Sequence, residues 1–141
     1  MNLNTEIEAI LHPGKIRDAG CASSPTVLSF VFDDDPHVRA VMSAGREAIP
    51  LIAQTIEKHG RELHDISLSC FVYILGKIDA RYAAEFLKPH YPVMLERPCP
   101  WAAYFTARII RSQRHLPIHR EIRFTRAELE EVLRPAASGS R

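Results

Sequence analysis

Residues that start and stop helices recur along the middle of this sequence and enclose short apolar stripes. Asp35-Pro36 combines a residue that caps helix N-termini with one that fits the first helical turn. Gly45 and Gly60 follow apolar stripes and predict helix ends, because glycine readily adopts the left-handed conformation found there. Pro50 fits only the first turn of the helix that lies between them. This part of the chain is therefore expected to fold into short helices separated by tight turns.

The next part of the sequence repeats this arrangement. We expect Asp65 to cap one helix and Gly76 to end it, and Asp79 to cap a second helix that Pro89 terminates. Pro100 predicts a third start. Apolar residues recur at helical spacings of three and four throughout: Val38, Val41, Met42, Ile49, Ile52, Ala53, Ile56, Leu68, Phe71, Val72, Leu75, Tyr82, Ala83, Phe86, Leu87, Trp101, Tyr104, Phe105, Ile109 and Ile110.

Both ends of the chain carry a further helix signal. Thr5 and Glu8 form a capping box, and Thr125 and Glu128 form another, so we expect a helix at each end. Residues 26–32 (TVLSFVF) are harder to assign, because β-branched and aromatic residues favour strands. The helical pattern of the surrounding sequence favours a helix there, with a strand as the alternative.

The three helix starts at Asp35, Asp65 and Cys99 are separated by similar lengths of chain, and a period of this size indicates stacked structural units. Residues 33–52 (DDDPHVRAVMSAGREAIPLI) and 75–87 (LGKIDARYAAEFL) resemble HEAT-like helical repeats. The similarity is to the short bacterial type, which is also found in phycobilin-lyase-type proteins. It rests on the Asp-Pro start, the Val-Arg pair, the glycine at the end of the first helix and the apolar second helix.

The resemblance implies an all-α fold, namely a right-handed α-solenoid-like stack of two to three HEAT-like helix pairs with capping helices. It covers about residues 33–90 and extends more loosely to 116, although the second unit lacks the Val-Arg pair. We expect a single domain over residues 1–135 and a disordered tail over residues 136–141, AASGSR. An irregular helical bundle with the same caps and stripes is the alternative.

Charge, cysteine usage and apolar content indicate the cellular compartment in which the chain is expected to fold. The formal net charge is +1, and no apolar run approaches the roughly 18 residues of a membrane helix. Cys21, Cys70 and Cys99 are odd in number and widely spaced, which does not predict a disulfide framework. We therefore expect a cytoplasmic protein without membrane contact, in which Cys70 is a buried, inert thiol.

Motifs for catalysis and metal binding are missing from the sequence. The seven histidines form neither HExxH nor a zinc pattern with cysteine, and no GxSxG, GxGxxG or Walker sequence is present. Cys99 has no identifiable histidine base to activate it. We therefore expect no catalytic residue, metal ligand or cofactor, and no enzymatic activity. A site assembled from scattered residues stays open.

Arginine and aromatic residues supply the candidate contact residues. Arg108, Arg111 and Arg114 follow a spacing of three and would form one stripe along a helix. Arginine is suited to binding carboxylates and phosphates, and tyrosine and arginine are enriched at protein interfaces. The candidate partner-binding residues are Arg81, Tyr82, Tyr104, Arg108, Arg111 and Arg114.

These features favour a non-catalytic protein–protein interaction module or adaptor that uses a helical-repeat surface, with an immunity-type protein as a more specific version. The first alternative is a nucleic-acid binder that uses the C-terminal arginine stripe, although a pI of about 7.8 is low for such a protein. The second is an enzyme or lyase helper. The partner is expected to be another protein of unknown identity, and the sequence does not decide between a monomer and a homodimer.

Overall fold

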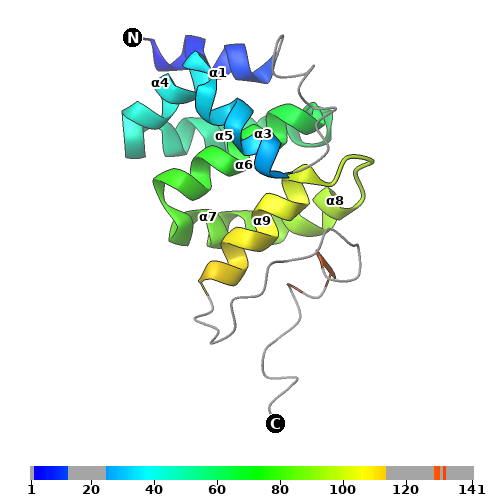
Figure 1. The fold of residues 1–141 in the computed structure, drawn as a ribbon. Coiled ribbons are helices and arrows are strands. Elements are labelled where there is room, and N and C mark those ends of the chain that lie inside the picture. Colours follow the sequence, from blue (N-terminus) through cyan, green and yellow to red (C-terminus); the bar gives the residue numbers. More distant parts are fainter. Residues whose placement is uncertain (1, 13–24, 114–128, 131, 133–141) are drawn as a thin grey trace.

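A computed structural model describes residues 2–12, 25–113, 129–130 and 132, and these residues form helices and no strand (Figure 1). The prediction of an all-α fold is therefore confirmed. The α-helices are α1 (Leu3–Leu11), α3 (Pro25–Asp34), α4 (Pro36–Ala44), α5 (Ala48–His59), α6 (Asp65–Ile78), α7 (Ala80–Leu87), α8 (Tyr91–Leu95) and α9 (Trp101–Ser112). Short 3₁₀ turns span Gly45–Glu47, Gly60–Glu62 and Lys88–His90.

Helix α6 is the centre of the molecule. It packs against α1, α4, α5, α7 and α9, and Figure 1 shows these helices following one another from α1 at one end to α7 and α9 at the other. Nine of its residues are buried, including Cys70 and the stripe residues Phe71, Val72 and Leu75. A helix that is apolar on most sides is expected in such a position, because it needs neighbours on all of them.

Four of the predicted start and stop residues act as expected. The Asp35 carboxylate accepts hydrogen bonds from the backbone N–H groups of His37 (2.9 Å) and Val38 (3.0 Å), which caps α4. Asp79 caps α7 in the same way. Gly45 and Gly60 end α4 and α5 with φ angles of 64° and 49°, a conformation that other residues adopt at a cost.

Two predicted caps are wrong by a few residues. Thr5 lies inside α1, because the helix begins earlier and the Asn2 side chain accepts the N–H of Thr5 at 3.3 Å. Asp65 is the first residue of α6 rather than its cap. His64 takes that place, since its Nδ1 atom accepts the N–H of Ile66 at 3.1 Å.

Gly76 does not end α6, as the sequence pattern predicted, but lies inside it. The reason is its neighbour on α9. A Cβ atom at position 76 would lie 2.6 Å from Cδ1 and 2.9 Å from Cγ1 of Ile109, closer than van der Waals contact allows. The glycine therefore permits a close approach of α6 and α9 and does not break the helix.

The remaining predictions concern less regular segments. Residues 26–32 are helical, as favoured, and belong to α3. Pro89 lies in a 3₁₀ turn, after which the chain forms the short helix α8, which no sequence pattern predicted. The capping box of Thr125 and Glu128, the domain end and the tail lie outside the described residues.

Candidate functional site

The predicted residues Tyr104 and Arg108 lie one turn apart on α9 and are in contact. The Arg108 guanidinium lies over the Tyr104 ring, 5.8 Å from its centroid. Tyr104 is buried, whereas Arg108 is exposed. A guanidinium in this position is held by the electrons of the ring, so its direction is partly fixed before any partner binds.

A second pair of the same kind lies on α6. The Lys77 ammonium is 5.4 Å from the centroid of the Tyr73 ring, again one turn apart on the helix. The Phe105 ring lies between the two tyrosines, with centroid distances of 5.5 Å to Tyr73 and 6.0 Å to Tyr104. The two pairs thus form one feature, which we call the cation–aromatic surface: Tyr73, Lys77, Tyr104 and Arg108.

Tyr73 also fixes α3 against this surface. Its hydroxyl donates a hydrogen bond of 2.7 Å to the Asp33 carboxylate, and its ring lies 5.5 Å from that of Phe32. Burial raises the pKa of the Tyr73 hydroxyl, and the hydrogen bond to Asp33 and the charge of that residue add to the effect. The hydroxyl therefore stays protonated at neutral pH and remains a donor.

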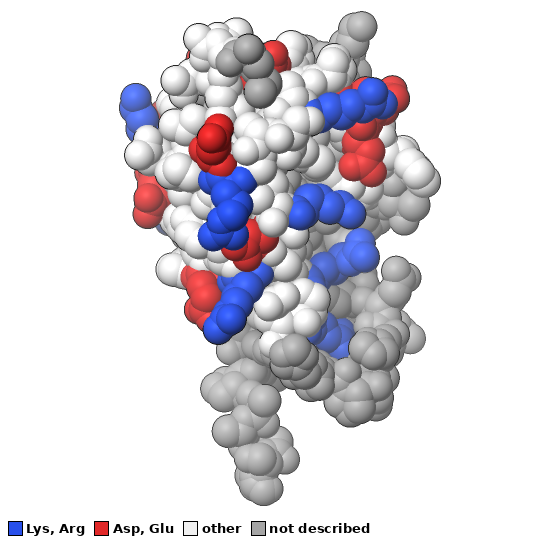
Figure 2. Space-filling model, turned by 90° about the vertical axis from the view of Figure 1, so that its left-hand side faces the viewer, with Lys and Arg blue, Asp and Glu red and all other residues white. Residues whose placement is uncertain are grey.

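The two cations of this surface have no carboxylate partner in the part of the chain that the structure describes. Within the same part, Arg39, Arg46 and Arg97 are all in ion pairs. Helix α9 has no acidic residue. On the face in Figure 2, basic side chains alternate with acidic ones on the left, whereas those at the lower right have no acidic neighbour among the residues drawn in colour. Surface cations that no carboxylate of the described residues binds are available to an external anion.

The other predicted contact residues are placed differently. Arg111 lies on α9 beyond Arg108 and is half-buried, and Arg114 lies outside the described residues. Arg81 is exposed near the start of α7. The Tyr82 ring stacks on that of Phe86 with a centroid distance of 5.8 Å. The structure therefore joins Tyr104 to Arg108, and Tyr82 to a residue of its own helix.

Tyr73 and Lys77 were missed as contact residues, although the sequence contains a signal for them. Lys77 follows Tyr73 by four residues, and Arg108 follows Tyr104 by four residues. The two tyrosines are therefore separated by the same number of residues as the two cations. A tyrosine followed by a cation at this spacing places both on one helix face. The recurrence of the pattern would have identified the second pair.

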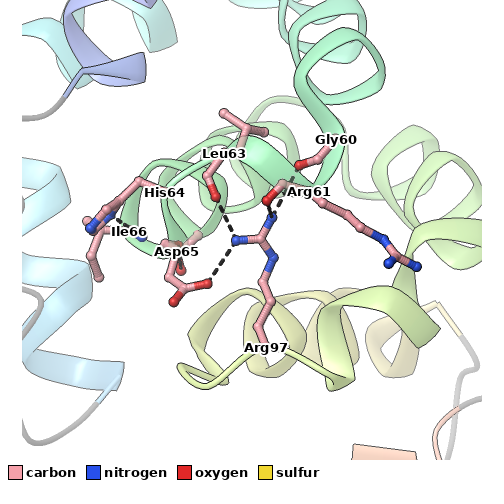
Figure 3. A network of polar contacts seen from close by, with 8 residues as sticks. Gly60, Arg61, Leu63, His64, Asp65, Ile66 and Arg97 are labelled. Carbon is pink, nitrogen blue, oxygen red and sulfur yellow. Dashed lines mark hydrogen bonds and ion pairs between the residues drawn. The ribbon is translucent and has the colours of Figure 1, made fainter.

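A cleft of about 440 Å³ lies beside the loop between α8 and α9, and Arg97 occupies one wall of it. The Arg97 side chain is only 11% exposed. It donates to the backbone oxygens of Leu63 (2.7 Å), Gly60 (3.2 Å) and Arg61 (3.4 Å) and to the Asp65 carboxylate at 2.8 Å (Figure 3).

These bonds give Arg97 a structural role. Its donors bind carbonyl groups at the turn between α5 and α6, where the Gly60 oxygen also accepts the N–H of Leu63 at 3.4 Å. The Arg61 side chain points away from this network in Figure 3. With its guanidinium engaged in this way, Arg97 joins the α8–α9 loop to the α5–α6 turn, and the cleft is not the best candidate for recognition.

The described residues do not form a metal or thiol site. Among residues 2–12, 25–113, 129–130 and 132, no three His, Cys, Asp or Glu side chains are grouped to hold a metal ion. Burial raises the pKa of the Cys99 thiol, and it raises that of Cys70 more strongly. Both thiols are therefore kept protonated, whereas a nucleophilic cysteine needs a lowered pKa.

Two findings complete the description of the chain. Within its described part, no helix combines the length and the apolar content needed to cross a membrane. Comparison of the chain with family models, with curated proteins and with solved structures finds no match.

Proposed function

We propose that this protein is a non-catalytic protein-binding module that recognises an acidic segment of its partner through the cation–aromatic surface. The observation that carries the proposal is the pairing of Lys77 with Tyr73 and of Arg108 with Tyr104 on adjacent helices. Both cations lie over aromatic rings and lack carboxylate partners among the described residues. A partner that supplies carboxylates would form ion pairs with both cations.

The arrangement suits protein recognition for two physical reasons. The tyrosine rings limit the motion of the cations, so less side-chain entropy is lost on binding. Tyrosine and arginine are also the side chains that most often dominate binding energy at protein interfaces. Charge complementarity at such a surface contributes mainly to association rate and specificity.

Acidic residues next to the surface favour a protein partner over nucleic acid. Asp33 is hydrogen-bonded to Tyr73, and Asp34 follows it on α3 with an 88% exposed side chain. These carboxylates would repel a continuous phosphate backbone. A protein segment, in contrast, can place its own carboxylates on Lys77 and Arg108 and avoid Asp34.

The proposal includes the helical-repeat architecture. We infer that α4 with α5 and α6 with α7 are two stacked HEAT-like helix pairs, and that α1 and α9 cover their ends. The packing of α6 against both the preceding and the following helices supports this inference. In such a module α6 and α9 supply the binding surface, as expected for an adaptor or an immunity-type protein.

The test is capture of partners from the source lysate with the tagged protein, with and without nuclease, read by mass spectrometry. The wild type is compared with Lys77→Glu/Arg108→Glu and with the matched control Lys58→Glu/Arg61→Glu. The control reverses two exposed charges, one in the last turn of α5 and one in the 3₁₀ turn that follows it. We expect one stoichiometric protein, insensitive to nuclease, to bind the wild type and the control and to be lost from the double variant.

The captured protein is then purified and its affinity measured at increasing salt. We expect the affinity to fall with salt for the wild type, because screening weakens exposed charge pairs. Equal binding by the charge-reversed variant would exclude the cation–aromatic surface. Capture that disappears with nuclease would replace this proposal with the nucleic-acid alternative.

A further inference from the structure

Helix α3 carries an apolar stripe on its outer side as well as on its inner side. Leu28 and Phe32 are fully buried against the core. On the other side Phe30 is 69% exposed, Val27 is 45% exposed and Val31 is half-buried. These three residues follow the spacing i, i+3, i+4 and so lie together on one helix face. We call them the outer α3 stripe.

The outer α3 stripe is unusual for a helix at the molecular surface. A helix that is apolar on opposite sides is normally covered on both, and single exposed apolar residues are common where contiguous ones are not. The stripe continues into a shallow hollow that is also lined by Asp33, Asp34 and Arg39. The surface is thus an apolar strip with charged residues at one end.

The charges at that end are unfavourably placed for α3 itself. Asp33 and Asp34 lie in its last turn, where the helix dipole is negative, and this turn has no basic residue. Arg39 from α4 compensates only in part, since its Nη2 atom lies 3.2 Å from an Asp34 carboxylate oxygen in an exposed ion pair. A positive group placed on the open side of Asp34 would therefore be favourable.

We propose that the outer α3 stripe binds the same stripe of a second copy of this chain, with the two α3 helices antiparallel about a two-fold axis near Phe30. In this arrangement each apolar stripe covers the other, as a self-complementary dimer interface requires. The C-terminal end of each α3, with Asp34, then lies beside the positive N-terminal end of the other α3. The apolar stripe matches a second apolar stripe, and the acidic end of α3 matches the positive end of a second α3. A second copy of the chain supplies both features, which singles it out as the partner.

The interface is small, because a helix of this length spans only about 15 Å. The dimer is therefore expected to form in a concentration-dependent manner. It uses residues other than those of the cation–aromatic surface, so it does not depend on the function proposed above.

The test measures the association constant by sedimentation velocity over a wide concentration range. Phe30→Glu places a charge in the centre of the stripe at an exposed position, and we expect it to weaken association about tenfold or more. Gln54→Glu, at an exposed position of α5, adds the same charge elsewhere and should associate like the wild type. Circular dichroism verifies that both variants are folded.

A second variant tests the orientation. Asp34→Lys relieves the unfavourable charge at the end of α3 but gives up the exposed ion pair with Arg39, so the melting temperature should change little. It also places a lysine beside the positive end of the second α3, so association should weaken. Lys77→Glu/Arg108→Glu should dimerise like the wild type, whatever becomes of its partner capture.

Three results would overturn the inference. They are a wild type that stays monomeric at the highest concentration, a Phe30→Glu variant that associates like the wild type, and stronger association of Asp34→Lys. Each leaves the capture experiment on the cation–aromatic surface unaffected.

Discussion

Arg97 shows how one side chain holds two distant parts of this chain together. It lies between α8 and α9 and donates to three backbone oxygens and one carboxylate of the α5–α6 turn. Only the fork of an arginine presents several donors in one plane, so a lysine cannot replace it. Removal of the guanidinium would take a donor from the carbonyl of the buried Leu63 and the ion-pair partner from Asp65.

Arg97→Ala is therefore expected to lower the free energy of unfolding by about 1–3 kcal/mol, because the Leu63 carbonyl and the Asp65 carboxylate, both largely removed from solvent, lose a donor. Arg97→Lys should recover only part of the loss. Arg46→Ala is the control, since Arg46 forms an exposed ion pair with Asp79, and it should change stability little. Chemical denaturation measures all three, and an effect of Arg97→Ala as small as that of Arg46→Ala would contradict the structural role.

The stability of the start of α7 depends on pH through the Asp79 carboxylate. The N–H of Tyr82 and the guanidinium of Arg46 bind its carboxylate and lower its pKa. A group with a lowered pKa in the folded state stabilises the fold above its unfolded pKa of about 4. This contribution is lost as the pH falls through the folded pKa. Asp79→Asn retains a capping oxygen but does not titrate.

We expect the Asp79→Asn variant to lose less stability than the wild type as the pH falls below about 4. Thermal unfolding at a series of pH values measures the difference. Glu57→Gln, at an exposed position of α5, removes a carboxylate that caps no helix and should follow the wild-type profile. Parallel profiles for the wild type and Asp79→Asn would disprove the role assigned to this carboxylate.

At the scale of elements, the contact between α6 and α9 determines how the molecule is packed. Gly76 lies against Ile109, whose side chain occupies the space that a Cβ atom at position 76 would need. An alanine at this position would raise helix propensity by up to about 1 kcal/mol and at the same time crowd Ile109. Whether the substitution raises or lowers the free energy of unfolding therefore depends on whether Ile109 is present.

Gly76→Ala is expected to destabilise the wild type by about 1 kcal/mol, because overpacking costs more than helix propensity returns. In an Ile109→Ala background the same change should be neutral or stabilising, since the clashing atoms are gone. A double-mutant cycle in urea measures the coupling between the two sites. Absence of coupling would mean that the helices do not meet at this point.

The same elements show what the sequence can predict. Local chemistry correctly assigned Asp35, Asp79, Gly45 and Gly60, because each acts within a few residues of its own position. Gly76 was misread because its role depends on a residue of another helix. The cap of α6 was misplaced by one position, since His64 and Asp65 are both competent hydrogen-bond acceptors.

In the candidate site too, the sequence predicts contacts within one helix better than contacts between helices. Tyr104 and Arg108 were both predicted as contact residues, and their contact lies within one helix, so residue spacing alone could have predicted the pair. The addition of Tyr73 and Lys77 requires that α6 and α9 lie side by side with Phe105 between them, which is a tertiary contact. Periodicity within a single helix does not report which helix is its neighbour.

At the scale of the whole molecule, α6 couples all parts of the core. Helices α1, α4, α5, α7 and α9 pack directly on it, and the Ser67 hydroxyl of α6 donates to the backbone oxygen of Ile10 in α1 at 2.8 Å. Cys70 lies at the centre of α6 and is fully buried. Exposure of this thiol therefore requires separation of most of the helices.

Cys70 is thus a probe of global unfolding. In a Cys21→Ser/Cys99→Ser variant, we expect thiol reagents to label Cys70 at a rate that follows the free energy of global unfolding as urea increases. Cys99 is half-buried, and in a Cys21→Ser/Cys70→Ser variant it should react faster under native conditions. Equal labelling of the two thiols without denaturant would indicate that the centre opens locally.

The Arg97 network also has a consequence for how this sequence can change over time. Three of its four acceptors are backbone oxygens, of Gly60, Arg61 and Leu63. Every amino acid supplies that atom, so replacement of the side chains at positions 61 and 63 leaves the acceptors in place. Position 97 has no such freedom. Among relatives of this chain, drift is therefore expected at the exposed position 61 and constancy at the arginine.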